Sequence, residues 1–171
     1  MRRIGWQLPL VVVLGMLAWF AIGPHVAALP ALYVAAVAPE LTRIDLAERR
    51  LPNRLVVPGL LVGVAAAAAS WATTGVAPVV PLVAGLAYGG MLFLLALTGG
   101  MGMGDVKLAA VLGLAAPTPV IALASPVLAF LSGGVVALVV LVARGRGTRI
   151  PFGPFLLLGY AGALLATVAL A

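Results

Sequence analysis

Seven runs of apolar residues fill almost the whole of this 171-residue chain, and short turns separate them. A bilayer core about 30 Å thick needs about 20 apolar residues for each helix that crosses it. By that measure the runs are 4–22, 26–44, 55–72, 78–97, 106–116, 120–143 and 150–170. The chain is 64% hydrophobic and 8% charged, so it lacks the polar residues that would cover a soluble domain of this length. We therefore predict an all-α polytopic membrane protein with about seven transmembrane helices.

Basic residues are confined to alternate connections between these runs. If the N-terminus is cytoplasmic, all ten lysines and arginines lie on the cytoplasmic side: Arg2, Arg3, Arg43, Arg49, Arg50, Arg54, Lys107, Arg144, Arg146 and Arg149. Cytoplasmic loops of membrane proteins carry such an excess of Lys and Arg. We therefore predict a cytoplasmic N-terminus and a multi-pass protein that lies in the lipid bilayer. The net charge of +6 then reflects orientation, and we expect no nucleic-acid partner.

The N-terminal run has the Arg2-Arg3 start and the apolar stretch of a signal peptide. However, the segment 19–24 has no cleavage site of the small-x-small type, and further apolar runs follow it. We therefore expect residues 1–25 to be a retained first transmembrane helix.

The fifth run, 106–116, is short enough to be a re-entrant helix instead of a crossing one. A re-entrant helix would place the basic residues of 144–149 on the outer side, so the charge pattern favours a crossing helix. A crossing helix this short implies that the glycine-rich segment 99–104 lies below the membrane surface. Irregular backbone at that depth requires a cover of protein or access to water. The sequence therefore predicts a water-filled notch at the cytoplasmic face.

Carboxylates are rare in this chain, and two of them lie at this predicted notch. The four acidic residues are Glu40, Asp45, Glu48 and Asp105. Asp45 directly follows the second run and Asp105 directly precedes the fifth, so both lie at the cytoplasmic boundary of the membrane. Carboxylates at such positions are costly and mark functional sites by default. The structural alternative is that Asp45 pairs with Arg49 and that Asp105 is only the N-cap of the helix that starts at Val106.

Two carboxylates that meet at one depth form an acid–base pair. Two carboxyl groups at close range cannot both be ionised, because their negative charges repel, so such a pair holds one proton between its members. The ionised member takes a proton from water, and the protonated member donates to a carbonyl oxygen, as in an aspartic protease. Because capping a helix N-terminus favours the charged form, we expect Asp105 to be the base.

Other residues near the pair have supporting roles. Glycine allows positive φ and the close approach of another backbone, so Gly100, Gly102 and Gly104 predict an exposed, adaptable loop before Val106. Lys107 either steadies a charged aspartate or extends to the membrane surface. Glu40 either pairs with Arg43 or joins the polar notch. The chain has no cysteine, so disulfides and cysteine-based zinc sites are excluded, and we expect no metal and no cofactor.

Three segments resemble motifs of the type IV prepilin peptidases. The first is 102–108, Gly-Met-Gly-Asp-Val-Lys-Leu, which resembles the family's G-x-G-D-x-K-L signature. The second is Ile-Asp-Leu at 44–46 with Leu-Pro-Asn at 51–53 and Pro58, which resembles the family's first-aspartate motif. The third is Ile-Pro-Phe-Gly-Pro-Phe-Leu at 150–156, which resembles a late motif of the family. The three occur in the expected order, which makes the resemblance much more specific than a lone GxGD.

The resemblance implies a bacterial cytoplasmic-membrane aspartic endopeptidase whose GxGD-type catalytic core of six helices, 26–171, follows one extra helix. It also implies that Asp45 and Asp105 are the catalytic pair. The implied partner is a type IV prepilin or a related pseudopilin, cut on the cytoplasmic side after a glycine that ends a short basic leader. Larger family members carry a four-cysteine zinc domain after the first span and also methylate the new N-terminus. Here three residues separate the first two runs, so the resemblance does not extend to methylation.

The alternative function is a small proton-coupled membrane carrier, since paired aspartates in helices also relay protons. Carriers place their charges near the midplane, often in inverted repeats with broken helices. Neither a repeat nor a midplane carboxylate is found in this sequence. Presenilin-like proteases share the GxGD element, but their first aspartate follows a tyrosine, whereas Ile44 precedes Asp45 here.

Overall fold

The structure is a computed structural model that describes residues 7–144 and 150–170. The start of the predicted first helix, 4–6, lies outside these ranges. So do Arg2, Arg3, Arg146 and Arg149, on which part of the predicted orientation depends.

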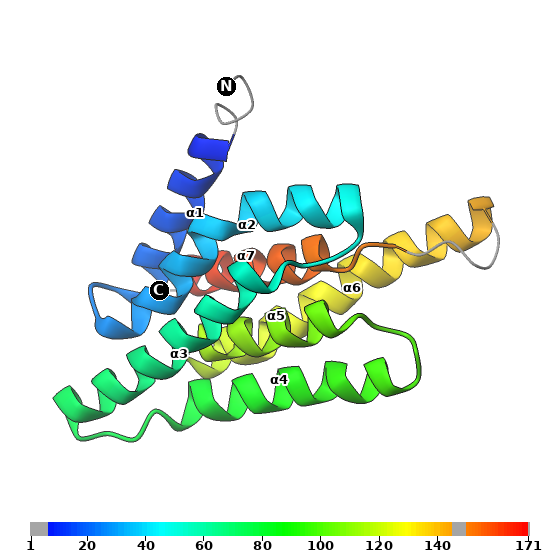
Figure 1. Ribbon diagram of the computed structural model, residues 1–171. Helices are drawn as coiled ribbons and strands as arrows, with labels where there is room; N and C mark the ends of the chain where they lie inside the picture. The colour runs from blue at the N-terminus through cyan, green and yellow to red at the C-terminus, as the bar shows by residue number, and fades with distance from the viewer. Residues whose placement is uncertain (1–6, 145–149, 171) are drawn as a thin grey trace.

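The described residues form seven α-helices and one short 3-10 helix, with no strand among them (Figure 1). In chain order they are α1 (Gln7–Ile22), η1 (Val26–Ala28), α2 (Leu29–Glu48), α3 (Asn53–Thr74), α4 (Val79–Leu97), α5 (Met103–Leu114), α6 (Pro119–Arg144) and α7 (Gly153–Ala169). The all-α prediction is confirmed for this part of the chain. Two helices end at glycines in the left-handed conformation, Gly23 after α1 and Gly75 after α3, where a side chain would be strained.

Four helical segments are long and apolar enough to cross a membrane: Val26–Glu48, Asn53–Thr74, Val79–Leu97 and Pro119–Ala143. α1 and α7 are apolar but shorter, with 16 and 17 residues. α5 has 12 residues, which at 1.5 Å per residue makes it roughly 18 Å long, well under the thickness of a bilayer core. The architecture is that of a helical membrane protein, while the number of crossings stays a prediction.

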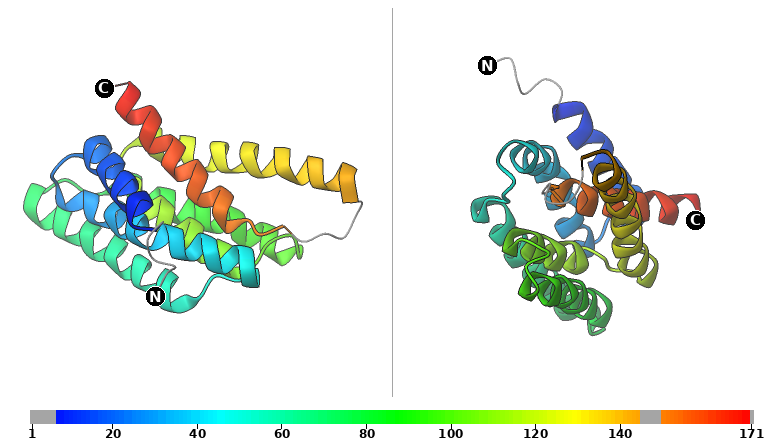
Figure 2. Two further views of the ribbon diagram at one scale, coloured as in Figure 1. Left: turned by 90° about the horizontal axis from the view of Figure 1, so that it is seen from above. Right: turned by 90° about the vertical axis from the view of Figure 1, so that its right-hand side faces the viewer.

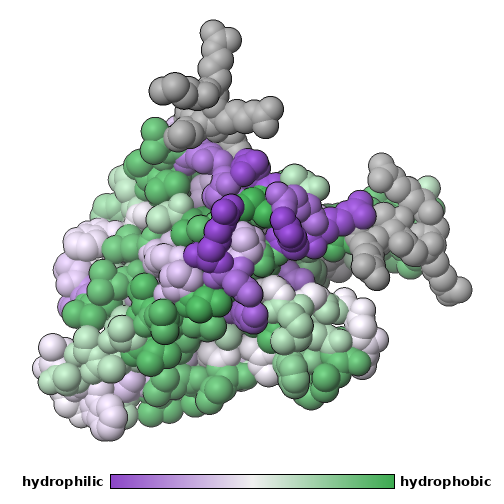
Figure 3. Space-filling model, in the orientation of Figure 1, coloured by the Kyte–Doolittle hydropathy of each residue, from purple (hydrophilic) through white to green (hydrophobic). Residues whose placement is uncertain are grey.

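Large apolar side chains point outward over most of the surface. Leu61, Leu86 and Val142 are 68%, 79% and 81% exposed. Figure 3 shows this apolar surface in green, with hydrophilic side chains gathered over the end of α2 and its connection to α3. An apolar surface of this extent is suited to lipid and not to water.

α5 is the central helix of the bundle, and it packs against α2, α3, α4 and α7 (Figure 1). Its residues Leu108, Ala109 and Leu112 are at most 1% exposed. A Cβ atom on Gly113 would lie 2.4 Å from the carbonyl oxygen of Ala84, so the backbones of α4 and α5 are in direct contact. This contact fixes the position of the α5 start, where Asp105 lies.

α6 and α7 form a second close pair. A Cβ atom on Gly159 of α7 would lie 2.5 Å from the backbone nitrogen of Ala129 in α6. α7 also packs against α1, α2 and α5. The end of α2, the start of α5 and the start of α7 consequently lie at one end of the bundle (Figures 1 and 2).

Candidate functional site

Asp45 lies in the last turn of α2 and is only 4% exposed. The helix ends at Arg49, which has a left-handed φ of 52° and whose N–H donates to the carbonyl oxygen of Asp45 at 2.9 Å. The carboxylate Oδ2 of Asp45 accepts a hydrogen bond from the backbone N–H of Gly153 at 2.9 Å. Gly153 is the first residue of α7, where backbone N–H groups have no partner within their own helix. Asp45 therefore caps α7 from a different helix.

The alternative ion pair between Asp45 and Arg49 is not formed. Within residues 7–144 and 150–170, the ion pairs are Arg43–Glu40 and Arg50–Glu48. The Asp45 carboxylate is thus stabilised by a backbone donor and not by a cation.

Asp105 lies in the first turn of α5 and is half-buried. The helix begins at Met103 with Gly102 as its N-cap, so the prediction that Asp105 is the N-cap is wrong, and the loop is shorter than expected. Asp105 is the third residue of the helix, and its Oδ2 accepts a hydrogen bond from the Gly102 N–H at 3.3 Å. An acidic side chain at this position reaches back to the N-cap N–H and allows the helix to start two residues before Asp105.

The two carboxylates line one cavity of about 620 Å³. Its other lining residues are Arg49, Gly99, Gly100, Met101, Gly102, Ile150, Pro151 and Phe152. Asp105 lies just before the apolar run that starts at Val106. Burial and, to a smaller extent, the negative charge of Asp45 raise the pKa of Asp105 to about 6. The structure thus brings Asp45 and Asp105 together, close enough for the charge of one to affect the titration of the other.

The predicted supporting residues divide into two groups. Gly100 and Gly102 line the cavity, where the absence of side chains leaves room beside Asp105. Gly104 and Lys107 do not line it. Lys107 Nζ donates to the Asn53 side-chain oxygen at 3.0 Å and so links α5 to the start of α3.

Leu51 connects all three sequence motifs. It is buried between the starts of α5 and α7. A Cβ atom on Gly104 would lie 2.9 Å from the Leu51 Cβ, and one on Gly153 would lie 3.2 Å from the Leu51 Cδ2 and 2.7 Å from the Asp45 Oδ2. Glycine at positions 104 and 153 therefore lets the two helix starts approach the segment that follows Asp45.

Gly153 is a site residue that the sequence did not single out. The motif at 150–156 stands out in the sequence, but nothing in it points to the aspartate pair. The structure places Ile150, Pro151 and Phe152 on the cavity wall. The Phe152 ring packs against Phe130 of α6, with 5.4 Å between the ring centroids. A glycine next to a proline at a helix start was the available signal, but the carboxylate that it meets is 108 residues away in the sequence.

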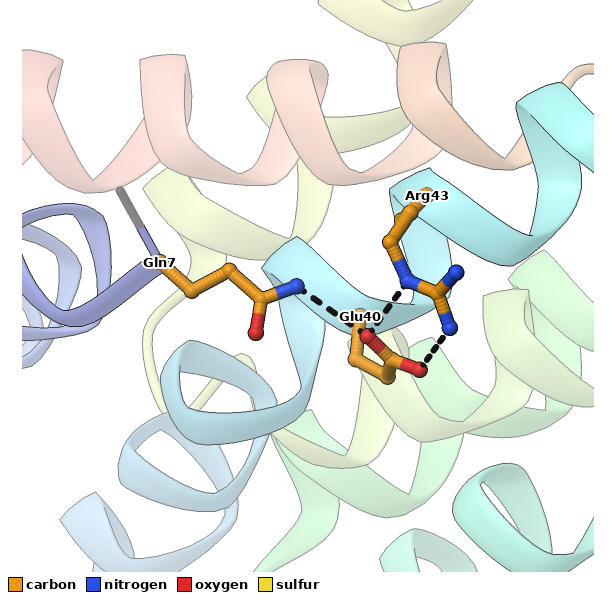
Figure 4. Close-up of polar contacts among 3 residues, drawn as sticks. All are labelled: Gln7, Glu40 and Arg43. Atoms are coloured by element: carbon orange, nitrogen blue, oxygen red, sulfur yellow. Dashed lines mark hydrogen bonds and ion pairs between the residues drawn. The ribbon is translucent and has the colours of Figure 1, made fainter. Parts of the chain in front are cut away.

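Glu40 lies outside the cavity and makes a separate polar contact. Its Oε2 accepts from Arg43 Nε at 2.8 Å and from Gln7 Nε2 at 3.1 Å (Figure 4). The first of the two alternatives for Glu40, a pair with Arg43, is therefore confirmed. The bond from Gln7 joins α1 to α2. In the part of the chain that the structure describes, no three His, Cys, Asp or Glu side chains come close enough together to hold a metal ion.

The fold and the cavity define a helical membrane protein with a pair of carboxylates at one end of its bundle. The model of the type IV leader peptidase family matches residues 32–142, which is more than half of the chain, and the chain belongs to this family. The resemblance found in the motifs is thereby confirmed. The matched segment includes Asp45 and Asp105 and ends before Gly153. None of the curated proteins or solved structures that were searched matches the chain.

Proposed function

We propose that this chain is a membrane aspartic endopeptidase that removes the short basic leader from type IV prepilins or related pseudopilins. The supporting observation is that Asp45 and Asp105, both inside the family-matched segment, line one cavity. Membership of a leader peptidase family supports the peptidase activity, and two adjacent carboxylates supply the means to activate water. The location of the cut at the cytoplasmic face of a bacterial inner membrane follows from the charge pattern and the resemblance.

In the proposed mechanism the two carboxyl groups share one proton. The ionised carboxylate takes a proton from a water molecule, whose oxygen attacks the carbonyl carbon of the scissile peptide. The protonated carboxyl donates its proton to the carbonyl oxygen. When the tetrahedral intermediate collapses, the C–N bond breaks and the amine leaves with the proton that the base had taken. A hydroxyl of the intermediate returns a proton to the carboxylate that had donated one, so the product is a carboxylic acid and the pair again holds one proton. The raised pKa of Asp105 supports a shared proton near neutral pH.

The cavity also fits the proposed substrate. Gly99 and Gly100 contribute no side chains to its wall, so an extended peptide backbone has room to approach the carboxylates. The cavity lies at the end of the bundle where hydrophilic side chains gather, and the apolar surface begins beside it (Figure 3). A substrate with a polar leader and an apolar helix would then have each part in a matching environment.

The test is cleavage of a co-expressed prepilin, followed by its gel shift, with variant levels checked in the membrane fraction. Asp45→Asn and Asp105→Asn each make one member permanently neutral and should lower cleavage by a factor on the order of 10² to 10⁴ or more. The double variant should be no worse than either single one, because residues that act as a unit are not additive. The matched controls Glu40→Gln and Glu48→Gln change carboxylates that lie outside the cavity and should retain most activity. Normal cleavage by Asp45→Asn at wild-type levels would disprove the two-aspartate mechanism.

A further inference from the structure

The contact between Gly153 and Asp45 lies at the very start of α7. α7 begins with Gly153 followed by Pro154, which has no N–H to donate. The N–H of Gly153 is therefore the donor that α7 presents at its very start, and it points at the buried Oδ2 of Asp45. The positive end of the helix dipole acts at this same position and favours an anion.

The two carboxylates differ in the support that they receive. Asp45 accepts a 2.9 Å bond from the start of a 17-residue helix, in a buried setting. Asp105 accepts a 3.3 Å bond from Gly102 at the start of its own 12-residue helix and is more exposed. Burial by itself disfavours the charged form of a carboxylate. A hydrogen bond to a charged acceptor opposes this effect, and it strengthens as it shortens and as water is removed.

The charged groups that face Asp45 do not change this comparison. Asp105 faces it from α5, and Arg49 lines the same cavity from the segment that follows α2. α7 has no charged residue anywhere in its sequence. The stabilisation that α7 gives to Asp45 therefore comes from its backbone.

We infer that the backbone N–H of Gly153 holds Asp45 as the ionised member of the pair, so that Asp45 is the general base and Asp105 carries the proton at rest. Gly153 is in this sense a positioning residue for the proposed function, on which the inference rests. The assignment reverses the one expected from the sequence, where Asp105 was the N-cap and the base.

The same contact explains why position 153 holds glycine. A Cβ atom there would lie 2.7 Å from the Asp45 Oδ2, closer than real Cβ atoms come to other atoms. The neighbouring atom belongs to the carboxylate itself, so any side chain at 153 would displace Asp45 from the N–H.

The first experiment measures the pH dependence of kcat/KM for prepilin cleavage in Gly153→Ala. The acid limb of the profile reports loss of the first proton from the pair, which leaves Asp45 ionised if the inference holds. Losing a hydrogen bond to this anion should move the acid limb to higher pH by about one to two units. The matched control is Gly162→Ala in the same helix, where a Cβ atom would meet only the flexible end of the Leu128 side chain at 3.0 Å, and it should leave the acid limb in place.

A second variant removes the N–H without adding bulk. Replacing Gly153 by glycolic acid converts the amide bond between Phe152 and Gly153 into an ester and leaves all other atoms in place. This ester variant should reproduce the shift of the acid limb. If only the alkaline limb moves, Asp45 carries the proton at rest and the assignment is wrong. If neither limb moves, Gly153 does not position Asp45.

A measurement without substrate separates this inference from the proposed function. In the Asp105→Asn background, the infrared C=O band of protonated Asp45 gives the titration midpoint of that residue alone. Adding Gly153→Ala should move the midpoint to higher pH by a similar amount, while adding Gly162→Ala should not. Failure of the wild-type protein to cut any prepilin would refute the proposed function and leave this titration valid. An unchanged midpoint would refute the inference even if the protein cuts prepilins.

Discussion

The effect of Asp105 on the stability of the folded protein depends on pH. Its pKa in the folded protein is about 6, above the ordinary value of about 3.9 that applies to the unfolded chain. The folded state therefore binds more protons than the unfolded state between these values. The contribution of this group to stability is fully favourable below pH 4 and is lost as the pH rises through 6.

Replacing Asp105 should remove this pH dependence. Asparagine still accepts a hydrogen bond from Gly102 but never ionises, so Asp105→Asn should raise the Tm relative to wild type at about pH 7.5 and much less at about pH 4. The measurement is thermal unfolding of the purified protein in detergent at the two pH values. An equal Tm difference at both pH values would show that ionisation of Asp105 does not destabilise the folded protein.

Metal removal should leave activity unchanged. The reaction proposed for Asp45 and Asp105 uses two carboxylates and water, and the cysteine-free sequence offers no thiolate ligands. Cleavage rates should therefore be the same before and after dialysis against EDTA. Loss of activity in EDTA that zinc restores would argue for a metal-activated water instead.

At this residue scale the sequence predicted the pair but not its environment. Asp45 and Asp105 stand out because carboxylates are so scarce in an apolar chain. The N-cap error at Asp105 arose because a carboxylate can cap from the N-cap or reach back from three residues later, and sequence allows both. The role of Gly153 was invisible because it depends on how α7 packs against α2.

At the scale of elements, α5 is positioned by glycine contacts. Its backbone touches α4 at Gly113, where a Cβ would lie 2.4 Å from the Ala84 oxygen. Backbone atoms cannot move aside as a flexible side chain can, so Gly113→Ala should force the two helices apart. This would cost about 1–3 kcal/mol or more.

The matched control is Gly90→Ala in α4, where a Cβ would meet nothing within 4 Å. It should be neutral or slightly stabilising, by up to about 1 kcal/mol, since alanine is the better helix former. Thermal unfolding in detergent distinguishes the two variants. Because the start of α5 carries Asp105, Gly113→Ala should also lower cleavage. Equal stability of both variants would mean that α4 and α5 are not in backbone contact.

The helices themselves were the most predictable part of the fold. Apolar runs and the turn residues between them located all seven, because hydrophobic length is a strong signal in a membrane protein. The sequence predicts the start of α5 three residues too late, at Val106 instead of Met103. Two glycines, Gly102 and Gly104, had marked that stretch as loop, but tertiary packing against Leu51 overrides the low helix propensity of glycine there.

At the scale of the whole molecule, the shortness of the central helix α5 affects both ends of the bundle. α5 spans only part of a bilayer, so the connection before it and the connection after it cannot both lie at a membrane surface. The cavity with the two aspartates lies at its start. Beyond its end, Thr74 and Thr118 line one pocket, so the connections after α3 and after α5 meet at the other end of the bundle.

The orientation of this bundle can be tested directly because the chain has no cysteine. Single cysteines at Thr74 and Thr118 should react with an impermeant thiol reagent added to whole cells, since both connections are expected to lie outside. Cysteines at Arg50 and Arg146 should react only after the membrane is permeabilised, because basic connections stay on the cytoplasmic side. Membrane levels of each variant and labelling after permeabilisation are the controls. Arg50 inside with Arg146 outside would show that α5 is re-entrant, that the prediction of seven crossings is wrong, and that the α6–α7 connection faces away from the cytoplasm.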